Sequence, residues 1–325
     1  MEDVIKRLRE GAKANPKRIV FPESDDERIT EAVKYIKEKG IAQPLLLAQD
    51  NLDSEKQEEF AADFHKRKKT KGVSFQEARK LMQNPLYYAC MMVRQGYADG
   101  FVAGAKSTTS SVIKAALNCL GVDKRVGIVS SCFIMVVPDC PYGERGVFVY
   151  ADCGVVPYPT SEQLANIAIS SARFAKDVLD IIPRVALLSF STKGSAASKW
   201  VRKVKEAVEI AESKNSGFLF DGELQADSAL VPQVARRKLA TSEVAGKANI
   251  LIFPSLDAGN ICYKLTQRLA RARAVGPILL GTPQPCSDLS RGCEVDDIID
   301  CTAVTVIRAQ KRAQEKTEDC AECAK

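Results

Sequence analysis

Residues 285–298, PCSDLSRGCEVDDI, bring together the side chains of this sequence that are best suited to chemistry. They include a hydroxyl at Ser290, a guanidinium at Arg291 and a pair of carboxylates at Asp296 and Asp297. The stretch leads into a predicted helix, and backbone N–H groups at a helix N-terminus favour an anion. Arg291 can hold a phosphate group through two parallel hydrogen bonds, and a nearby carboxylate can accept a proton. A capped helix without a ligand explains the same residues, with Ser290 as the cap.

A second stretch, residues 99–114 (DGFVAGAKSTTSSVIK), places small and hydroxyl side chains after a short predicted strand. Small residues let a ligand approach the backbone, and the hydroxyls of Ser107 and Thr108 can bond phosphate oxygens. Lys114 follows within the next predicted helix. A polar loop that caps this helix is an equally good interpretation.

Two later motifs are more ambiguous. Residues 189–195, SFSTKGS, resemble a shortened phosphate-binding loop. They lack the first glycine and the spacing of a Walker A motif, which excludes a nucleoside triphosphatase, while Ser191 and Thr192 can still contact phosphate. Residues 221–227, DGELQAD, hold three carboxylates that can bind a divalent cation or accept hydrogen bonds from a loop. No G-x-G-x-x-G pattern follows a predicted strand, so a Rossmann dinucleotide site is not supported.

One dense basic run, HKRKKTK at residues 65–71, contains Arg67 and Lys68. It fits a solvated helix end or, alternatively, a site for a phosphate-rich ligand. The net charge of +6 is too small to indicate nucleic acid as a partner. Since His65 is the single histidine, we expect neither a histidine base nor a bound metal.

Strand-like and helix-like segments alternate along the chain and must position these motifs. The helix that follows Thr160 and Gln163 begins with a capping-box pattern. Alternation of this kind predicts an α/β protein with a mainly parallel sheet covered by helices. The predicted strands are residues 18–22, 44–48, 100–104, 125–137, 146–152, 185–191, 218–220, 250–253 and 278–280, and the main predicted helices are 24–39, much of 51–95, 110–120, 164–178, 199–212 and 295–312.

Length and composition limit the class of protein further. A chain of 325 residues is long enough for two α/β domains, with ligands bound in a cleft beyond the carboxyl ends of strands. No apolar run is as long as a transmembrane helix, and the charged, amphipathic N-terminus has no signal-peptide core, so we expect a cytoplasmic protein that does not enter a membrane. The eleven cysteines are scattered and odd in number, which favours free thiols.

Seven stretches, in order along nearly the whole chain, closely resemble the phosphate acetyltransferase (phosphotransacetylase) family. One of them, DGELQADSALVP, is more similar to the acetyl enzymes than to the related phosphate butyryltransferases. The seven are FPESDDERI, ADGFVAGAKSTT, MVVPDCPYGERGVFVYADCG, LSFSTKGSA, DGELQADSALVP, VAGKANILIFPSLDAGNICYKLTQRL and DLSRGCEVDDI.

The resemblance implies two three-layer α/β domains in the fold shared with isocitrate and isopropylmalate dehydrogenases, with the active site in the cleft between them. On this basis the first domain takes residues 1–137 and 288–325, and the second takes residues 138–287. The resemblance also implies a homodimer that transfers an acetyl group reversibly between acetyl phosphate and coenzyme A. Coenzyme A is then a substrate, and no cofactor is bound permanently.

The motifs also carry over individual residues. Ser290, Arg291 and Asp297 fall on the family's catalytic serine, arginine and aspartate, because SRGCEVDD matches without a gap. Lys114 stands where the family has an arginine for a coenzyme A phosphate, and a lysine keeps the charge but loses the bidentate fork. A second such arginine falls on Lys68, and its neighbour Arg67 can serve as well.

Three alternatives remain open from sequence. The first is a phosphate butyryl- or propionyltransferase, since the size of the acyl pocket decides between these enzymes. The second is a metal- and NAD-dependent decarboxylating dehydrogenase on the same fold, which the three carboxylates of DGELQAD suggest. The third is a regulator that binds coenzyme A or acetyl phosphate without turnover; the complete set of Ser290, Arg291 and Asp297 argues against it.

Overall fold

The computed structural model describes residues 2–48, 52–214, 216–239 and 241–323. The chain divides into two compact units. We call them the central unit, Met1–Ile5 and Val122–Gly281, and the terminal unit, Lys6–Gly121 and Thr282–Lys325. Each unit is described by itself below.

The terminal unit is built on four parallel strands in the order β2-β1-β3-β10. They are β1 (Arg18–Phe21), β2 (Gln43–Leu46), β3 (Gly100–Ala103) and β10 (Cys286–Asp288). Strand β10 was not predicted, because it has only three residues and its polar letters look like part of the motif that follows. It pairs with β3 so that Asp288 lies beside Ala103. This pairing places the loop after β3 next to residues Ser290–Cys293, which follow β10 and which we call the SRGC stretch.

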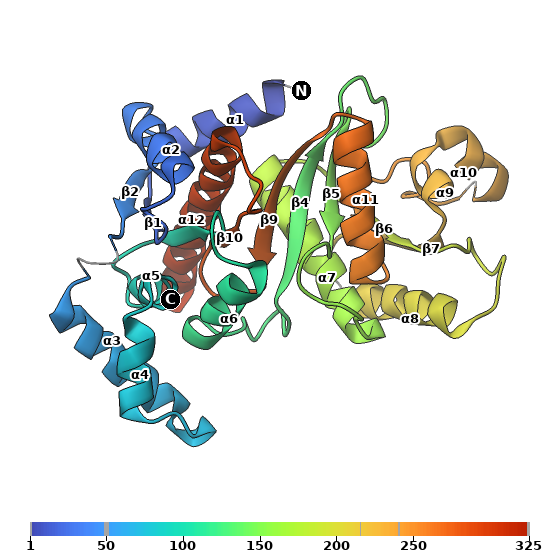
Figure 1. The fold of residues 1–325 in the computed structure, drawn as a ribbon. Helices are drawn as coiled ribbons and strands as arrows, with labels where there is room; N and C mark the ends of the chain where they lie inside the picture. Colours follow the sequence, from blue (N-terminus) through green and yellow to red (C-terminus); the bar gives the residue numbers. More distant parts are fainter. Residues whose placement is uncertain (1, 49–51, 215, 240, 324–325) are drawn as a thin grey trace. The chain divides into compact units, whose positions relative to one another are not determined.

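Helices cover both faces of these four strands. On β10 the hydroxyl of Ser287 meets Thr305 of α12 at 2.7 Å, whereas the adjacent buried Cys286 lies near the buried Cys90 of α5. Alternate residues of a strand point to opposite faces, so α12 and α5 lie on opposite sides. The helices of this unit are α1 (Glu2–Lys13), α2 (Glu27–Glu38), α3 (Ser54–Lys68), the 3₁₀ turn η2 (Lys69–Lys71), α4 (Phe75–Met82), α5 (Pro85–Arg94), α6 (Thr109–Cys119) and α12 (Val295–Cys323) (Figure 1). Helix α12 continues well past residue 312, where the predicted helix ended.

The central unit has six strands in the order β9-β4-β5-β8-β6-β7. Strand β4 runs antiparallel to both of its neighbours, and the other pairs are parallel, which confirms a mainly parallel sheet. The strands are β4 (Ser130–Val136), β5 (Val147–Ala151), β6 (Arg184–Leu188), β7 (Leu219–Leu224), β8 (Ile250–Ile252) and β9 (Arg273–Leu280). One expectation was wrong: the strand predicted at 218–220 ends too early, and Asp221–Leu224 of DGELQAD belong to β7, which runs four residues past Phe220.

The helices of the central unit pack on both faces of its sheet (Figure 1). The capping box of Thr160 and Gln163 is present at the start of α7. On the face toward α11, Phe133 of β4 stacks on Tyr263 with ring centroids 4.1 Å apart. The helices are α7 (Ser161–Phe174) with the π-turn η3 (Ala175–Leu179), α8 (Lys199–Ser213), α9 (Ala226–Leu230), α10 (Pro232–Lys238) and α11 (Leu256–Leu269). Among the described residues, no helix combines the length and the apolar character that crossing a membrane requires.

Candidate active site

The SRGC stretch forms a tight turn between β10 and α12. The N–H of Cys293 donates to the carbonyl of Ser290 at 2.9 Å, and the N–H of Gly292 donates to the Ser290 hydroxyl at 3.3 Å. The side chains of Ser290 and Arg291 are exposed. Within the described residues the guanidinium of Arg291 has no hydrogen bond or ion pair, so its charge is available to an anionic ligand.

Asp297 lies in the first turn of α12, half-buried. One of its carboxylate oxygens accepts the N–H of Glu294 at 3.0 Å, which fixes the side chain next to the SRGC turn. The neighbouring Asp296 points elsewhere and pairs with Arg9 of α1 at 2.7 Å. Arg9 also binds the buried Asp300 at 2.7 Å, one turn further along α12. Asp296 therefore helps to hold α1 on α12, and Asp297 is the carboxylate beside Ser290 and Arg291.

Arg28, at the start of α2, holds the SRGC turn by binding its backbone carbonyl groups. One nitrogen of its guanidinium donates to the carbonyls of Arg291 and Cys293 at 2.9 and 2.8 Å, and the other donates to the carbonyl of Ala105 at 2.9 Å. The same group pairs with Asp26 at 2.7 Å. This contact lowers the pKa of Asp26 and raises that of Arg28, so the clamp stays charged. Arg28 thus ties the turn after β10 to the loop after β3.

The loop after β3 is also held by the buried carboxylate of Glu23. The N–H groups of Gly104, Ala105 and Ser107 each donate to its carboxylate at 2.8 Å, and that of Lys106 donates at 3.3 Å. Four donors on one carboxylate give this loop a single backbone path. The exposed ammonium of Lys106 is held by Asp25.

The loop held by Glu23 leads directly into α6, so that Ser107 and Thr108 lie just before the first residue of this helix. Thr108 is the N-cap: its hydroxyl accepts the N–H of Ser111 at 3.2 Å and lies 2.9 Å from the Ser111 hydroxyl. Thr108 is exposed and Ser107 is half-buried, so both remain next to the free N–H groups of the first helical turn. The structure therefore contains the predicted helix cap, and this arrangement also suits a phosphate group.

Close packing under this loop depends on Gly104. Its φ is +115°, and a Cβ atom there would lie 2.4 Å from Oδ1 of Asp288 and 2.6 Å from the backbone nitrogen of Leu289. Only glycine fits such a contact. Asp288 is fully buried at the end of β10, and burial raises the pKa of its carboxyl group to about 7.

The predicted coenzyme A residues Arg67, Lys68 and Lys114 lie on α3 and α6. Together with Lys71 of η2 and Arg94 of α5 they form what we call the basic patch. The ammonium of Lys68 lies 3.4 Å from the side-chain oxygen of Asn118, one helical turn beyond the exposed Lys114. Burial, Lys71 and Arg67 lower the pKa of Lys68. Like charges gathered in this way favour a bound polyanion.

Arg67 differs from Lys68 in its surroundings. Its guanidinium pairs with Asp63 at 2.9 Å and donates to the carbonyl of Cys119 at 2.9 Å. Burial and the nearby Arg94 lower its pKa. Because these contacts already occupy the guanidinium, Lys68 is the better candidate for contact with a ligand phosphate.

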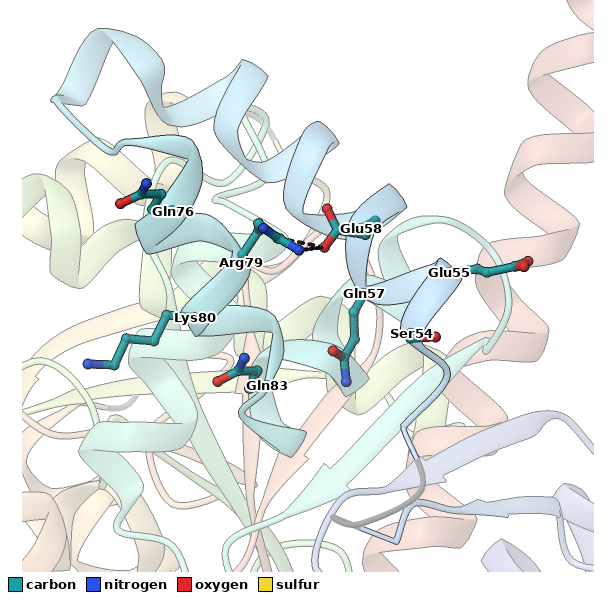
Figure 2. A pocket seen from close by; sticks show the side chains of 8 residues that line it. All are labelled: Ser54, Glu55, Gln57, Glu58, Gln76, Arg79, Lys80 and Gln83. Carbon is teal, nitrogen blue, oxygen red and sulfur yellow. Dashed lines mark hydrogen bonds and ion pairs between the residues drawn. The ribbon is translucent and has the colours of Figure 1, made fainter.

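A groove of about 830 Å³ lies between α3 and α4, outside the basic patch (Figure 2). Figure 2 shows Arg79 reaching from α4 to Glu58 of α3, and their charged groups are 2.5 Å apart. Two acidic residues, Glu55 and Glu58, face two basic ones, Arg79 and Lys80, so the charges of the lining cancel. This groove gives a polyanion no electrostatic preference, unlike the basic patch.

Ser191 and Thr192 belong to the central unit, in the loop after β6. The Ser191 hydroxyl donates to the buried Glu223 at 2.9 Å, and the Thr192 hydroxyl donates to the side-chain oxygen of Gln225 at 3.2 Å. The N–H of Gly194 donates to the same Glu223 oxygen at 2.7 Å. Both hydroxyls are buried and hydrogen-bonded, so they shape the loop, and their contact with a substrate stays a prediction.

The carboxylates of DGELQAD have separate partners. Asp221 pairs with Lys193 at 2.5 Å, Glu223 holds the loop of Ser191, and Asp227 accepts the N–H of Ser228 at 2.7 Å. No cluster of three or more potential metal ligands occurs in the part of the chain that the structure describes. The nine cysteines whose side chains the structure describes are free, as the sequence predicted.

Arg28, Glu23 and Asp288 were not predicted to have a role, although all three lie inside the motifs FPESDDERI and DLSRGCEVDDI. The sequence did contain a signal for the role of Glu23. A carboxylate immediately after one strand can accept hydrogen bonds from the backbone N–H groups of a glycine-containing loop after the next strand. The contacts themselves depend on the order β1-β3-β10, which a strand of three residues did not reveal.

Comparisons with known proteins identify the family of this chain. The family model described as phosphate acetyl/butaryl transferase matches residues 3–306. The chain is 45% identical to a phosphate acetyltransferase of Acetivibrio thermocellus over 329 residues, covering 95% of this chain and 98% of the relative. It is 46% identical to one of Thermoanaerobacterium thermosaccharolyticum over 326 residues, covering 94% and 99%.

Solved structures give the same result. A phosphotransacetylase from Streptococcus pyogenes superimposes with a TM-score of 0.86 at 34% identity, covering 96% of this chain and 99% of that one. The EutD phosphotransacetylase from Staphylococcus aureus superimposes with a TM-score of 0.83 at 36% identity, covering 94% and 98%. A match to the family model over most of the chain, with full-length relatives at this identity, means that the chain belongs to the phosphate acetyl/butaryl transferase family.

Proposed function

We propose that this protein catalyses the reversible reaction of acetyl phosphate with coenzyme A to give acetyl-CoA and phosphate. The observation that carries the proposal is the SRGC turn, which Arg28 holds so that Ser290, Arg291 and Asp297 lie together at the start of α12. These residue types suit acyl transfer to a thiol. The names of the most similar relatives support acetyl as the acyl group.

In the proposed mechanism Asp297 receives the proton of the coenzyme A thiol. A thiol with a pKa of about 8.5 is only slightly ionised at neutral pH, and the thiolate is the nucleophile. The thiolate attacks the carbonyl carbon of acetyl phosphate, and the C–O bond to phosphate then breaks. Ser290 and Arg291 donate hydrogen bonds to the oxygens on which negative charge develops. Phosphate leaves, and the proton from the thiol ends on it or in solvent.

No protein thiol takes part in this scheme. Cys293 is the cysteine nearest to the catalytic residues in sequence, but it is buried, and burial raises its pKa to about 11. A thiol that stays protonated is a poor nucleophile. Direct transfer between the two substrates is therefore the simpler route, and holding both in one site supplies part of the rate enhancement.

The basic patch is the proposed site for the phosphates of coenzyme A, with Lys68 and Lys114 as its contacts. We further propose that the enzyme works in the cytoplasm with no permanently bound cofactor. Both substrates carry phosphate charges that keep them in the aqueous compartment where they are made.

The acyl preference tests the proposed function. In an assay of thioester absorbance with coenzyme A, acetyl phosphate should give a higher kcat/KM than propionyl or butyryl phosphate. One methylene group changes discrimination by only about 1–3 kcal/mol, so slower reaction of propionyl phosphate is expected. A preference for butyryl phosphate would place the enzyme with the butyryl branch of the family. Absence of thioester from all three would overturn the proposed function.

We also propose that the enzyme is a homodimer in which α11 contributes to the contact. Ile261, Leu265 and Leu269 are 57%, 53% and 80% exposed and recur every four residues, which gives α11 an uncovered apolar stripe. Equilibrium sedimentation should give twice the chain mass of 35.5 kDa.

A charge within the stripe should weaken this dimer. Leu265→Glu should shift the sedimentation mass toward that of one chain. Ile182→Glu is the matched control, because Ile182 is 71% exposed but lies outside α11 and should leave the mass unchanged. A wild-type mass of one chain would contradict the homodimer, and an unchanged mass for Leu265→Glu would contradict this contact.

A further inference from the structure

Asp288 is a buried carboxyl group that the proposed mechanism does not use. It ends β10, two residues before Ser290, and its exposed fraction is 0%. Neither of its oxygens has a partner of standard hydrogen-bond geometry among the described residues. A buried polar group in this condition calls for a functional or structural explanation.

The side chain of Asp288 points to the face of the sheet that carries α6. It lies on the same face as Cys286, the residue two positions earlier on β10, and opposite to Ser287, which meets α12. The hydroxyl of Thr109 and the N–H of Leu289 are close enough to lower the pKa of Asp288. Thr109 is the first residue of α6, directly after the N-cap Thr108, and so belongs to the helical turn whose backbone N–H groups favour phosphate.

The charged and titratable groups around Asp288 are few. The negative charge of Glu23, after β1, raises its pKa, and the thiol of Cys286 on β10 is another buried acid nearby. From α12, Arg308 donates to the carbonyl of Cys286 at 3.1 Å and not to Asp288. Strand β3 and the first turn of α6 present no charged side chain to it. Among the described residues, Asp288 therefore has no positively charged hydrogen-bond partner that would keep it ionised.

We propose that Asp288 is a positioning residue for this reaction: in its neutral form it donates a hydrogen bond to the Thr109 hydroxyl, which leaves the hydroxyl hydrogen of Thr109 free to bind a phosphate oxygen of the substrate. The inference rests on the proposed function and names a contact for the phosphate group of acetyl phosphate. The lack of a standard hydrogen bond to either oxygen of Asp288 among the described residues fits this role, since catalytic hydrogen bonds often tighten only when the substrate binds.

The direction of the hydrogen bonds makes the protonation state decisive. A neutral carboxyl group donates to Thr109, and Thr109 in turn donates to phosphate. An ionised carboxylate only accepts, so the Thr109 hydrogen turns toward Asp288 and lone pairs face the phosphate. Burial raises the pKa of Asp288 to about 7, so it is neutral below that pH and ionised above it. Phosphate binding should therefore weaken as the pH rises through about 7.

The test is the KM for acetyl phosphate at about pH 6 and about pH 8.5. For the wild-type enzyme this KM should rise about five-fold or more between the two values, as expected for losing a hydrogen bond to a charged group. Asp288→Asn has an amide that donates at every pH, so the ratio of the two KM values should fall to about one. The KM for coenzyme A serves as the control in each case and should keep the same ratio in wild type and variant.

Two variants of Thr109 complete the test. Thr109→Ser keeps the hydroxyl and should keep the pH dependence, whereas Thr109→Val should raise the KM for acetyl phosphate at both pH values and abolish the dependence. The inference is overturned if the wild-type ratio is about one, if Asp288→Asn retains the wild-type ratio, or if Thr109→Val behaves like wild type. The Thr109 variants decide the question even where Asp288→Asn does not fold.

Binding of sulfate separates this inference from the proposed function, because sulfate keeps the same charge across this pH range and needs no turnover. Calorimetry should show weaker sulfate binding at the higher pH for wild type and equal binding for Asp288→Asn. If the enzyme forms no thioester but sulfate binding follows this pattern, the proposed reaction is wrong and the role of Asp288 stands. If thioester forms and sulfate binding is the same at both pH values for wild type, the role of Asp288 is wrong.

Discussion

Asp297→Asn is expected to lower kcat by about two to four powers of ten, the usual effect of removing a general base. The amide cannot take the thiol proton, so the nucleophile would have to ionise without help. The fold should persist, because the amide oxygen can still accept the N–H of Glu294, the contact that now measures 3.0 Å. A steady-state assay with saturating acetyl phosphate and coenzyme A measures this loss directly.

Asp296→Asn is the matched control for this variant. Asp296 is 63% exposed and pairs with Arg9, so its replacement should lower stability by no more than about 1 kcal/mol and leave kcat close to that of wild type. If Asp296 proved essential and Asp297 dispensable, the register taken from the family motif would be wrong. If neither carboxylate mattered, proton removal would belong to water or to the phosphate, and the role of Asp297 would have to be withdrawn.

The sequence was sufficient for the elements with strong local signals. The capping box of Thr160 and Gln163 begins α7 as predicted, because both halves of that motif lie within four residues of each other. The alternation of strands and helices likewise predicted the mainly parallel sheet, since it depends on hydrophobic periodicity along the chain. The same local reasoning placed Ser290 and Arg291 beside a helix N-terminus, where the structure also places them.

The clamps of the site could not be obtained in this way, because they join residues far apart in the sequence. Arg28 reaches the carbonyl of Arg291, 263 positions away, and Glu23 holds the N–H of Gly104, 81 positions away. Such contacts require the order of strands β1, β3 and β10, and β10 has too few residues to show a period. The sequence therefore contained Arg28 and Glu23 within its motifs but did not reveal which backbone groups they hold.

Lys68→Ala is expected to raise the KM for coenzyme A about tenfold while leaving the KM for acetyl phosphate nearly unchanged. Coenzyme A carries several phosphate charges and acetyl phosphate carries one phosphate group. The loss of one charged contact to phosphate is worth about 1.4 kcal/mol or more, which corresponds to that factor. Lys114→Ala should have a smaller effect, because its exposed ammonium is better screened by solvent.

Arg79→Ala is the control variant for the basic patch. It also removes a positive charge near α3, but Arg79 faces the neutral groove of Figure 2 and pairs with Glu58, so the KM for coenzyme A should not change.

Added salt should raise the wild-type KM for coenzyme A and have less effect on Lys68→Ala, because screening acts on the charge that this variant lacks. Equal changes in both KM values for Lys68→Ala would remove the basic patch from the coenzyme A site. An effect of Arg67→Ala on KM that exceeds that of Lys68→Ala would instead assign the phosphate to Arg67, against the contacts that now occupy its guanidinium.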